Sequence, residues 1–416
     1  MKSNKPSGIS LFCGAVIIAL ILSPGLKAQT LDDFINLTEG ANPRIQAYEL
    51  RYDIASEKVN EAQVLGPTEL GAAYFVSEPE TRTGAQKFRL SARQMFPWFG
   101  TITSRENYAE AMAEAEYEEL VIIRRKLALE VTQVYYTIQQ LQAKRAVLEE
   151  HISLLQQYEA LAIQAVEVDK AGAADVLRLQ IRENDLVREL EILKEKLKAE
   201  KAMLNSLADR STGTEVRIEA YEVMIPEIER DASFDLELHP ELVKYDKLYN
   251  SVEQAEMLNQ KQNTPNFGIG LDYINVQERP DMTFDDNGKD ILMPMVSFSI
   301  PIFNEKFSSV SRQNELKKRE IEAQRSERLN ELNARLFKAI AEQNAARITF
   351  ESLEANIGKA EDTKKILLTK YETGELDFTE LLEIESLQLR LEIAQVEAVL
   401  SFYLQTAFIQ YLSYNS

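Results

Sequence analysis

The stretch Phe96-Pro97-Trp98-Phe99-Gly100 separates two segments of opposite character. Before it, residues 86–96 alternate apolar and polar side chains, which is the period of a β-strand. After it, residues 101–168 contain no proline or glycine and consist mostly of good helix formers. At about 1.5 Å per residue, such a helix would be on the order of 100 Å long. Pro97 is therefore predicted to join a sheet to a very long helix.

The same order recurs in the second half of the chain. The stretch Ile300-Pro301-Ile302-Phe303-Asn304 again follows alternating segments and precedes a long helical run, which places a second sheet-to-helix junction at Pro301. We therefore predict two structural repeats, residues 29–236 and 237–416, and neither could bury its strands or helices alone. Strands are expected at about 68–77 and 86–96 in the first repeat and at about 266–276 and 290–300 in the second.

Each long helical run is interrupted once by a turn. Gly172 ends the first run and Asp175 is placed to cap the returning helix, while Gly374 and Asp377 have the same offsets in the second repeat. The first returning helix has leucines at heptad spacings, a narrow stripe that is typical of a coiled coil. These leucines are Leu186, Leu190, Leu193, Leu197, Leu204 and Leu207.

The polar face of the second strand contains Lys87, Arg89 and Arg93. Each expected strand has about ten residues, the length needed to cross a bilayer at a tilt. If the strands cross a membrane, these cations line an aqueous lumen; a soluble, half-buried sheet with an ordinary polar face is the alternative. Four membrane strands cannot close a barrel, and open edges in hydrocarbon leave costly unpaired backbone groups. Copies of the chain would therefore pool strands. Two copies would give eight strands and a lumen filled by side chains, and three would give twelve, enough for a water-filled passage.

Residues 1–28 are predicted to be a secretory signal peptide. Lys2 and Lys5 precede an apolar stretch at residues 11–22 that is too short to span a bilayer, although a short membrane anchor is an alternative. The sole cysteine, Cys13, lies inside this stretch, so disulfides and cysteine metal sites are not expected in the mature chain. The net charge of −20 excludes a nucleic-acid partner by default, because phosphate binding requires a basic surface.

No catalytic residue, cofactor or metal site is expected. The sequence contains no Gly-x-x-x-x-Gly-Lys phosphate loop, no Gly-x-Ser-x-Gly elbow and no His-Glu-x-x-His zinc motif. His151 and His239 are far apart in sequence, whereas zinc sites need clustered ligands. Met282, Met293 and Met295 could suggest a soft-metal site, but scattered loop and strand methionines are the favoured interpretation.

Taken together, the pattern resembles the TolC-like outer membrane efflux proteins, the outer membrane factors of tripartite efflux systems. The resemblance covers essentially the whole expected mature chain. It rests on the duplicated layout, on Asn42-Pro43, on the junctions at Pro97 and Pro301, and on Tyr371-Glu372-Thr373-Gly374 followed by Phe378-Thr379-Glu380-Leu381-Leu382. It implies a mainly α chain whose long coiled-coil helices form a trimeric α-barrel, continuous with a twelve-stranded membrane β-barrel to which each chain contributes four strands.

The resemblance also implies a function and partners. The homotrimer would give passive exit through the outer membrane, in contact with its lipid, with the helices in the periplasm and no enzymatic activity. An inner-membrane pump of the RND or ABC type would supply the energy through a periplasmic adaptor that docks on the helix turns at Gly172 and Gly374. Glu380 and Glu383 would form an acidic ring at the periplasmic gate; two solvated surface acids are the alternative. The alternative function is a non-conducting periplasmic coiled-coil scaffold or adaptor.

Overall fold

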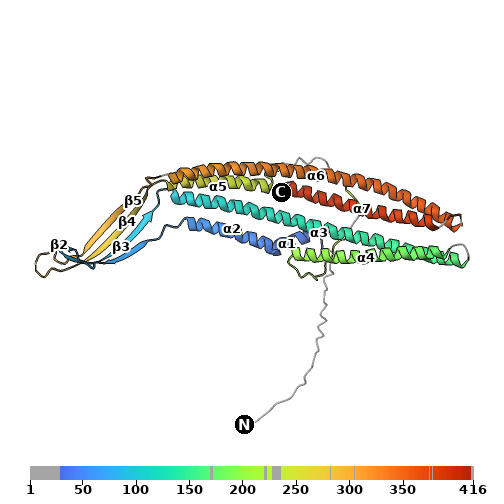
Figure 1. Cartoon of the computed structure of the whole chain (residues 1–416), viewed down its shortest axis with the longest axis horizontal. Helices are drawn as coiled ribbons and strands as arrows, with labels where there is room; N and C mark the ends of the chain where they lie inside the picture. Colours follow the sequence, from blue (N-terminus) through green and yellow to red (C-terminus); the bar gives the residue numbers. More distant parts are fainter. Residues whose placement is uncertain are drawn as a thin grey trace, which may run out of the picture.

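The computed structural model describes residues 29–168, 172–219, 223–226, 236–281, 283–303, 305–373, 375–376 and 378–413. The expected signal peptide, residues 1–28, lies outside this part of the chain, as do the predicted turn residues Gly374 and Asp377. Within the described part, the molecule is elongated, with a β-sheet at one end and the turns of two long helical hairpins at the other (Figure 1).

The two halves of the chain have the same order of elements. The first half contains helices α1 (Leu31–Ala41) and α2 (Pro43–Ala62), strands β1 (Glu69–Tyr74), β2 (Glu80–Thr81) and β3 (Gly84–Phe96), and helices α3 (Thr101–Glu167) and α4 (Ala173–Leu207). The second half contains a short 3-10 helix (Leu236–Leu238), helix α5 (Pro240–Gln262), strands β4 (Asn266–Gln277) and β5 (Ile291–Ser299), and helices α6 (Glu305–Glu372) and α7 (Phe378–Leu412). The sequence prediction of a mainly helical chain with a small antiparallel sheet is confirmed.

In each half, the helix that directly precedes the strands begins with a polar cap followed by proline; these helices are α2 and α5. The Asn42 side chain accepts a hydrogen bond from the Arg44 amide at 2.8 Å, and Pro43 occupies the first position of α2, where no amide donor is needed. The Asn42 amide group also donates to the Leu207 carbonyl at 2.7 Å, so the cap fixes the end of α4. In the second half, the His239 ring accepts a bond from the Glu241 amide at 3.3 Å ahead of Pro240.

The sheet is antiparallel, with strand order β1-β3-β4-β5 and the two-residue β2 paired beside β3. Strands β3 to β5 lie where the sequence predicts them, but the first strand ends at Tyr74 rather than near residue 77. The chain turns away through Pro79, and β2 lies between the two strands expected in the first repeat, where no strand was predicted. Because β1 and β5 are the outer strands, each has one edge without a strand partner in the described chain.

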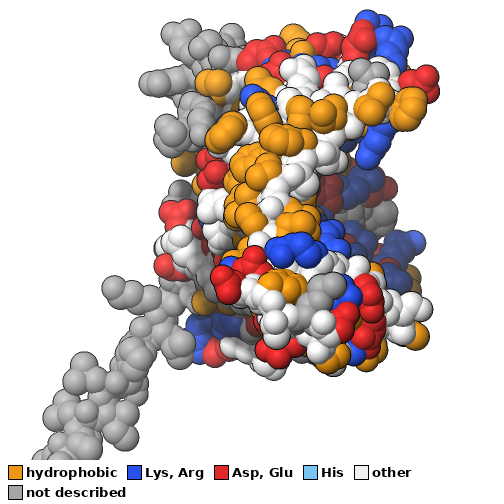
Figure 2. Space-filling view, turned by 90° about the vertical axis from the view of Figure 1, so that its left-hand side faces the viewer, with side chains coloured by type: hydrophobic (Ala, Val, Ile, Leu, Met, Phe, Trp, Pro, Cys, Tyr) orange, Lys and Arg blue, Asp and Glu red, His pale blue; other side chains and the backbone are white. Residues whose placement is uncertain are grey.

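The strand register gathers the apolar side chains on one face of the sheet. Leu90 lies opposite Ala72 on β1 and Tyr273 on β4, and Tyr273 lies opposite Leu292 on β5. Large side chains of this face are solvent-exposed, up to 80% for Leu70. Figure 2, which views the sheet end of the molecule, shows hydrophobic side chains gathered in a band with charged side chains at its ends. A contiguous exposed apolar face of this kind marks a surface that contacts another protein or a membrane.

The helices form two connected groups along the length of the molecule. Near the sheet, α3 packs on both α2 and α5, and α5 packs on α6; toward the turns, α3 packs on α4 and α6 packs on α7 (Figure 1). Helix α3 also packs on α7, so α3 joins the two halves of the chain, as do the paired strands β3 and β4. Within the described residues, no helix combines the length and apolar character that crossing a membrane requires.

Candidate functional site

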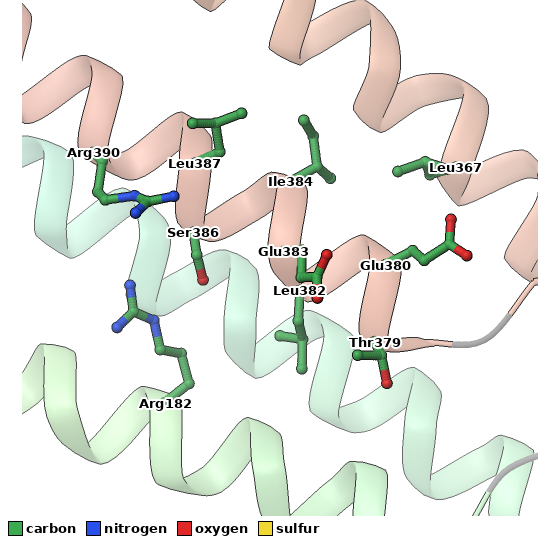
Figure 3. Close-up of a pocket in the computed structure, with 10 residues that line it drawn as sticks. All are labelled: Arg182, Leu367, Thr379, Glu380, Leu382, Glu383, Ile384, Ser386, Leu387 and Arg390. Carbon is green, nitrogen blue, oxygen red and sulfur yellow. The ribbon is translucent and has the colours of Figure 1, made fainter.

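A groove lies between α4 and α7 near the turns of the helical hairpins (Figure 3). Its volume is about 980 Å³, and it is lined by Arg182 of α4, by Leu367 of α6, and by one side of α7 between Thr379 and Arg390. The sequence-predicted acids Glu380 and Glu383 both line this groove. Their spacing of three residues places them on one side of α7, as expected for a helix.

The groove has an acidic part and a basic part. Glu380 and Glu383 lie close to the turn, whereas Arg390 approaches the side of the groove farther from the turn and Arg182 reaches toward the same region from α4, with Ser386 between them (Figure 3). Neither arginine forms an ion pair within the described part of the chain. These two arginines were not among the site residues predicted from the sequence. Arg390 could have been found, because it follows Glu383 by seven residues and so shares its helical side, but nothing in the sequence points to Arg182.

The first turn is stabilised by the residues that the sequence predicts. Asp175 accepts a hydrogen bond from the Gly172 amide at 3.3 Å, which caps α4 as expected. Arg178 lies 3.3 Å from an Asp175 carboxylate oxygen and donates to the Thr379 hydroxyl at 3.1 Å. Arg178 therefore connects the first turn of α4 to the first turn of α7.

Aromatic side chains hold the start of α7 in place. Phe378 is 1% exposed, and its ring packs edge-on against Tyr158 of α3 and Tyr371 of α6, with centroid distances of 6.0 and 5.1 Å. Leu381, one turn later, is fully buried. The segment that presents Glu380 and Glu383 is therefore fixed on its opposite side by a packed core.

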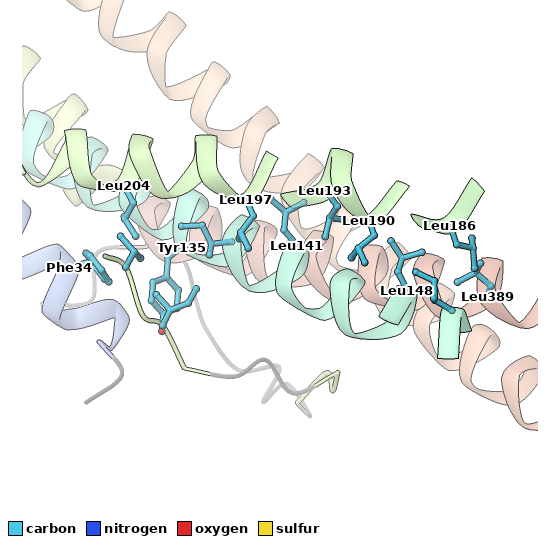
Figure 4. Packing of buried hydrophobic residues seen from close by; sticks show 14 of the residues in the cluster. Phe34, Tyr135, Leu141, Leu148, Leu186, Leu190, Leu193, Leu197, Leu204 and Leu389 are labelled. Carbon is cyan, nitrogen blue, oxygen red and sulfur yellow. The ribbon is translucent and has the colours of Figure 1, made fainter. Parts of the chain in front are cut away.

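The opposite wall of the groove is positioned by the leucine stripe of α4. All six predicted leucines are buried, and they pack against residues of α3 such as Leu141 and Leu148 (Figure 4). Burying each leucine contributes about 1.5–3 kcal/mol relative to exposure. The coiled-coil stripe read from the sequence is confirmed, and it holds α4, including Arg182, on α3.

The three cations predicted for the sheet have different surroundings. Lys87 forms an ion pair with Glu78, and Arg89 forms one with Asp272, a side chain with no solvent exposure. Arg93 lies opposite Glu69 on β1 and Gly270 on β4, and it forms no ion pair within the described residues. Arg89 and Arg93 share the face opposite Leu90, because they alternate with it along β3.

The two histidines have separate structural surroundings. His239 caps α5, whereas His151 on α3 lies between two carboxylates of α7, Glu385 and Glu392. In the part of the chain that the structure describes, no group of three or more side chains has a metal-binding arrangement. Met293 and Met295 lie in β5, and Met282 is outside the described residues.

Comparison with known proteins shows similarity in structure rather than in sequence. No family model matches the chain, and no curated protein matches it. The channel-forming protein CusC matches over 92% of both chains, with a TM-score of 0.76 and 12% identity. The outer membrane protein VceC of Vibrio cholerae matches over 92% of this chain and 95% of its own, with a TM-score of 0.71 and 17% identity.

A third structure extends the comparison. The CmeC outer membrane channel of Campylobacter jejuni matches over 92% of this chain and 85% of its own length, with a TM-score of 0.73 and 13% identity. All three similarities cover 92% of this chain. The chain therefore has the fold of these outer-membrane channel proteins.

Proposed function

We propose that three copies of this chain assemble into an outer-membrane channel that gives passive exit to substrates of a tripartite efflux system. Each copy would contribute four strands to a twelve-stranded β-barrel in the membrane and four long helical stretches to a continuous α-barrel in the periplasm. The observation that supports this most strongly is the sheet, whose apolar face is exposed and whose outer strands, β1 and β5, each have one edge without a strand partner in the described chain.

The exposed sheet would be unfavourable in a protein that stays monomeric in water. Leu70, Val296 and Phe298 are between 65% and 80% exposed, and burying apolar surface contributes about 25 cal/mol per Å². In a membrane, lipid chains cover the apolar face favourably. The backbone N–H and C=O groups on the free edges of β1 and β5 remain without hydrogen bonds, because hydrocarbon offers no partner. Pairing β1 of one copy with β5 of the next satisfies both edges, and closure with three copies leaves a lumen wide enough for water.

The opposite end of the molecule supports the partner assignment. The groove at the hairpin turns contains charged side chains of both signs and faces the periplasm when the sheet is in the outer membrane. The turns at Gly172 and Gly374 would dock a periplasmic adaptor, which would link the channel to an inner-membrane pump of the RND or ABC type. The energy comes from that pump, so this chain needs no catalytic site. Three copies of Glu380 and Glu383 would form an acidic ring around the periplasmic gate, which favours cations.

A non-conducting periplasmic scaffold remains the second candidate. Its helices would need the same leucine stripe, but it would have no use for an exposed apolar sheet face. The two functions can be separated by substitutions on that face. Leu90→Lys with Val296→Lys should prevent membrane insertion, since a basic residue on the lipid face of a barrel costs about 2–4 kcal/mol at mid-bilayer. A scaffold would tolerate both changes.

The proposed function is tested by reconstituting the purified protein in planar lipid bilayers. We expect discrete conductance steps of uniform size, and we expect the Leu90→Lys, Val296→Lys double variant to give none. Wild-type protein that is folded and associated with lipid, yet never conducts at any applied voltage, would refute the channel and favour the scaffold.

A further inference from the structure

His151 joins the two helical hairpins through a buried cluster of charges. Its side chain projects from α3 and is almost fully buried, and each ring nitrogen faces a carboxylate of α7. Nδ1 lies 2.6 Å from a Glu385 oxygen, and Nε2 lies 2.8 Å from a Glu392 oxygen. Lys364 of α6 approaches the other Glu385 oxygen at 3.5 Å, and Gln388 donates to Glu392 at 2.8 Å.

This geometry favours a charged histidine, because each ring nitrogen lies within 2.8 Å of a carboxylate oxygen. A neutral imidazole has one N–H group and therefore can donate to only one of two acceptors, whereas the imidazolium has two. Burial opposes protonation of His151, but its bonds and charge interactions with Glu385 and Glu392 outweigh burial and raise its pKa to about 9. The ring is therefore a cation at neutral pH, and its positive charge is located between the two halves of the chain.

Glu385 depends on this cation. Its carboxylate is buried, and although His151 is close to it, the contact lacks the direction of a good hydrogen bond, so neither Glu385 oxygen has such a bond. The charge of Glu385 is balanced by His151 and Lys364 alone among the described residues. Removing one partner of a buried ion pair is strongly unfavourable, because an uncompensated buried charge remains.

The cluster lies next to the proposed gate along α7. Glu385 follows Glu383 by two residues in the same unbroken helix, but it faces α3 while Glu383 faces the groove. Toward the turn, the described residues of the two hairpins are connected by the exposed hydrogen bond from Arg178 to Thr379. A further ion pair between α3 and α7, from Lys144 to Glu397, lies on the other side of the cluster and is largely exposed at Glu397. The His151 cluster is thus the buried charged attachment nearest to the gate.

We propose that His151 is a positioning residue of the channel, whose imidazolium holds Glu385 and Glu392 against α3 and so keeps the gate segment, residues 378–384, in its narrow arrangement. The inference rests on the proposed channel function and identifies what restrains the gate. Without the cation, Glu385 and Glu392 repel each other and face a single lysine from α6. Helix α7 then separates from α3, and the three copies of the gate segment move outward together.

The proposal predicts an alkaline opening of the channel. The attachment is complete below the usual histidine pKa of 6.5 and is lost as the pH rises through about 9, because the raised pKa belongs to the folded state. Tyr158 lies near Glu385 and stays neutral in this range. Its pKa is raised to about 12, mainly by burial and further by the charge of Glu385.

The test is the bilayer conductance of wild type, His151→Gln, His151→Lys and His239→Gln between pH 7 and pH 10. Wild type should show a several-fold rise in conductance centred near pH 9. His151→Gln should conduct at the raised level already at pH 7 and show no step. His151→Lys restores a cation and should return conductance at pH 7 to the wild-type level. His239→Gln replaces a buried histidine without carboxylate partners on its ring and should behave as wild type.

The outcomes distinguish this inference from the channel proposal. If no variant and no wild-type sample conducts, the channel itself is refuted. If the wild type conducts but shows no step near pH 9, or if His151→Gln retains the step, the role of His151 is refuted while the channel stands. If His151 were only structural, His151→Gln and His151→Lys would lose assembly equally. The lysine would then not restore the wild-type conductance at pH 7. If His151→Gln does not assemble, the wild-type profile and His151→Lys decide the question.

Discussion

The Tyr411 hydroxyl donates a hydrogen bond of 2.7 Å to the Glu241 carboxylate, which joins the last turn of α7 to the first turn of α5. Glu241 is 6% exposed, and it also forms ion pairs with Lys126 of α3 and Arg328 of α6. Four helices therefore meet at one buried carboxylate, at the level where α7 ends. Burial opposes its ionisation, but the bonds from Tyr411 and Lys126 outweigh this effect and lower the pKa of Glu241 to about 2.

Tyr411→Phe should destabilise the chain without changing its fold. The substitution removes the hydroxyl donor from a buried, charged acceptor, and such a bond is worth about 1.5–3 kcal/mol. We expect a lower midpoint of thermal unfolding, followed by circular dichroism in detergent at pH 7. Tyr74→Phe is the matched control, because Tyr74 is 68% exposed and its hydroxyl has no partner within the described chain. An equal midpoint for Tyr411→Phe and wild type would contradict this role.

His239 should make the folded chain less stable in mild acid. Burial lowers the pKa of His239 to about 4 from its usual 6.5, despite the opposing charge of Glu241. Because the unfolded state then binds the proton more readily, stability falls as the pH decreases from 6.5 to 4. Denaturant unfolding at pH 7, 6, 5 and 4 should show this loss, and His239→Gln should flatten it. A profile that is unchanged by the substitution would show that another group causes the acid dependence.

Replacing Glu380 and Glu383 with alanine should alter entrance selectivity. If three copies of each carboxylate surround one axis, their removal lowers the attraction for cations, so the cation-to-anion permeability ratio should fall severalfold in bilayer recordings. Glu189→Ala, an exposed acid of α4 outside the groove, should leave the ratio unchanged. Equal ratios in wild type and the double variant would show that these acids are ordinary surface residues.

The two faces of the sheet should differ in their access to water. Cysteine introduced at Arg93, on the polar face, should react with water-soluble maleimides in reconstituted vesicles. Cysteine at Leu90 should react only with lipid-phase reagents, because neighbouring residues of a strand point to opposite faces and these two positions have opposite parity. The only natural cysteine, Cys13, lies in the expected signal peptide, so the background is low. Reversed labelling would mean that the apolar face lines the lumen.

The features that the sequence predicted are local in origin. Pro97 and Pro301 mark the ends of strands ahead of long helices, because proline has no backbone N–H to donate and is disfavoured inside a helix. The buried stripe from Leu186 to Leu207 follows from heptad spacing alone. The shorter first strand and the small β2 were missed, because the segment after Tyr74 depends on pairing with β3 rather than on its own pattern. Strand alternation also placed Leu90 and Arg93 on opposite faces before any register was known.

The features that the sequence missed depend on contacts between distant segments. His151 and Glu385 lie in different repeats, and only the packing of α3 on α7 brings them together. The spacing of seven residues between Glu385 and Glu392 shows that they share one side of a helix, but it does not show that this side faces a histidine. The same holds for Glu241, whose partners come from α3, α6 and α7.

The central claim, that free sheet edges compel three copies to join, is tested most directly by cross-linking β1 to β5. One cysteine would replace Ala73, and a second would be placed in turn along residues 292–298. Within one chain these strands are separated by about three strand spacings, roughly 14 Å, which exceeds the reach of about 7 Å for a disulfide. Only contacts between copies can therefore react. Oxidation in membranes should give a covalent band of three copies and nothing larger at one or more positions. Monomers at every position, or a ladder that ends at two copies or continues beyond three, would contradict the account.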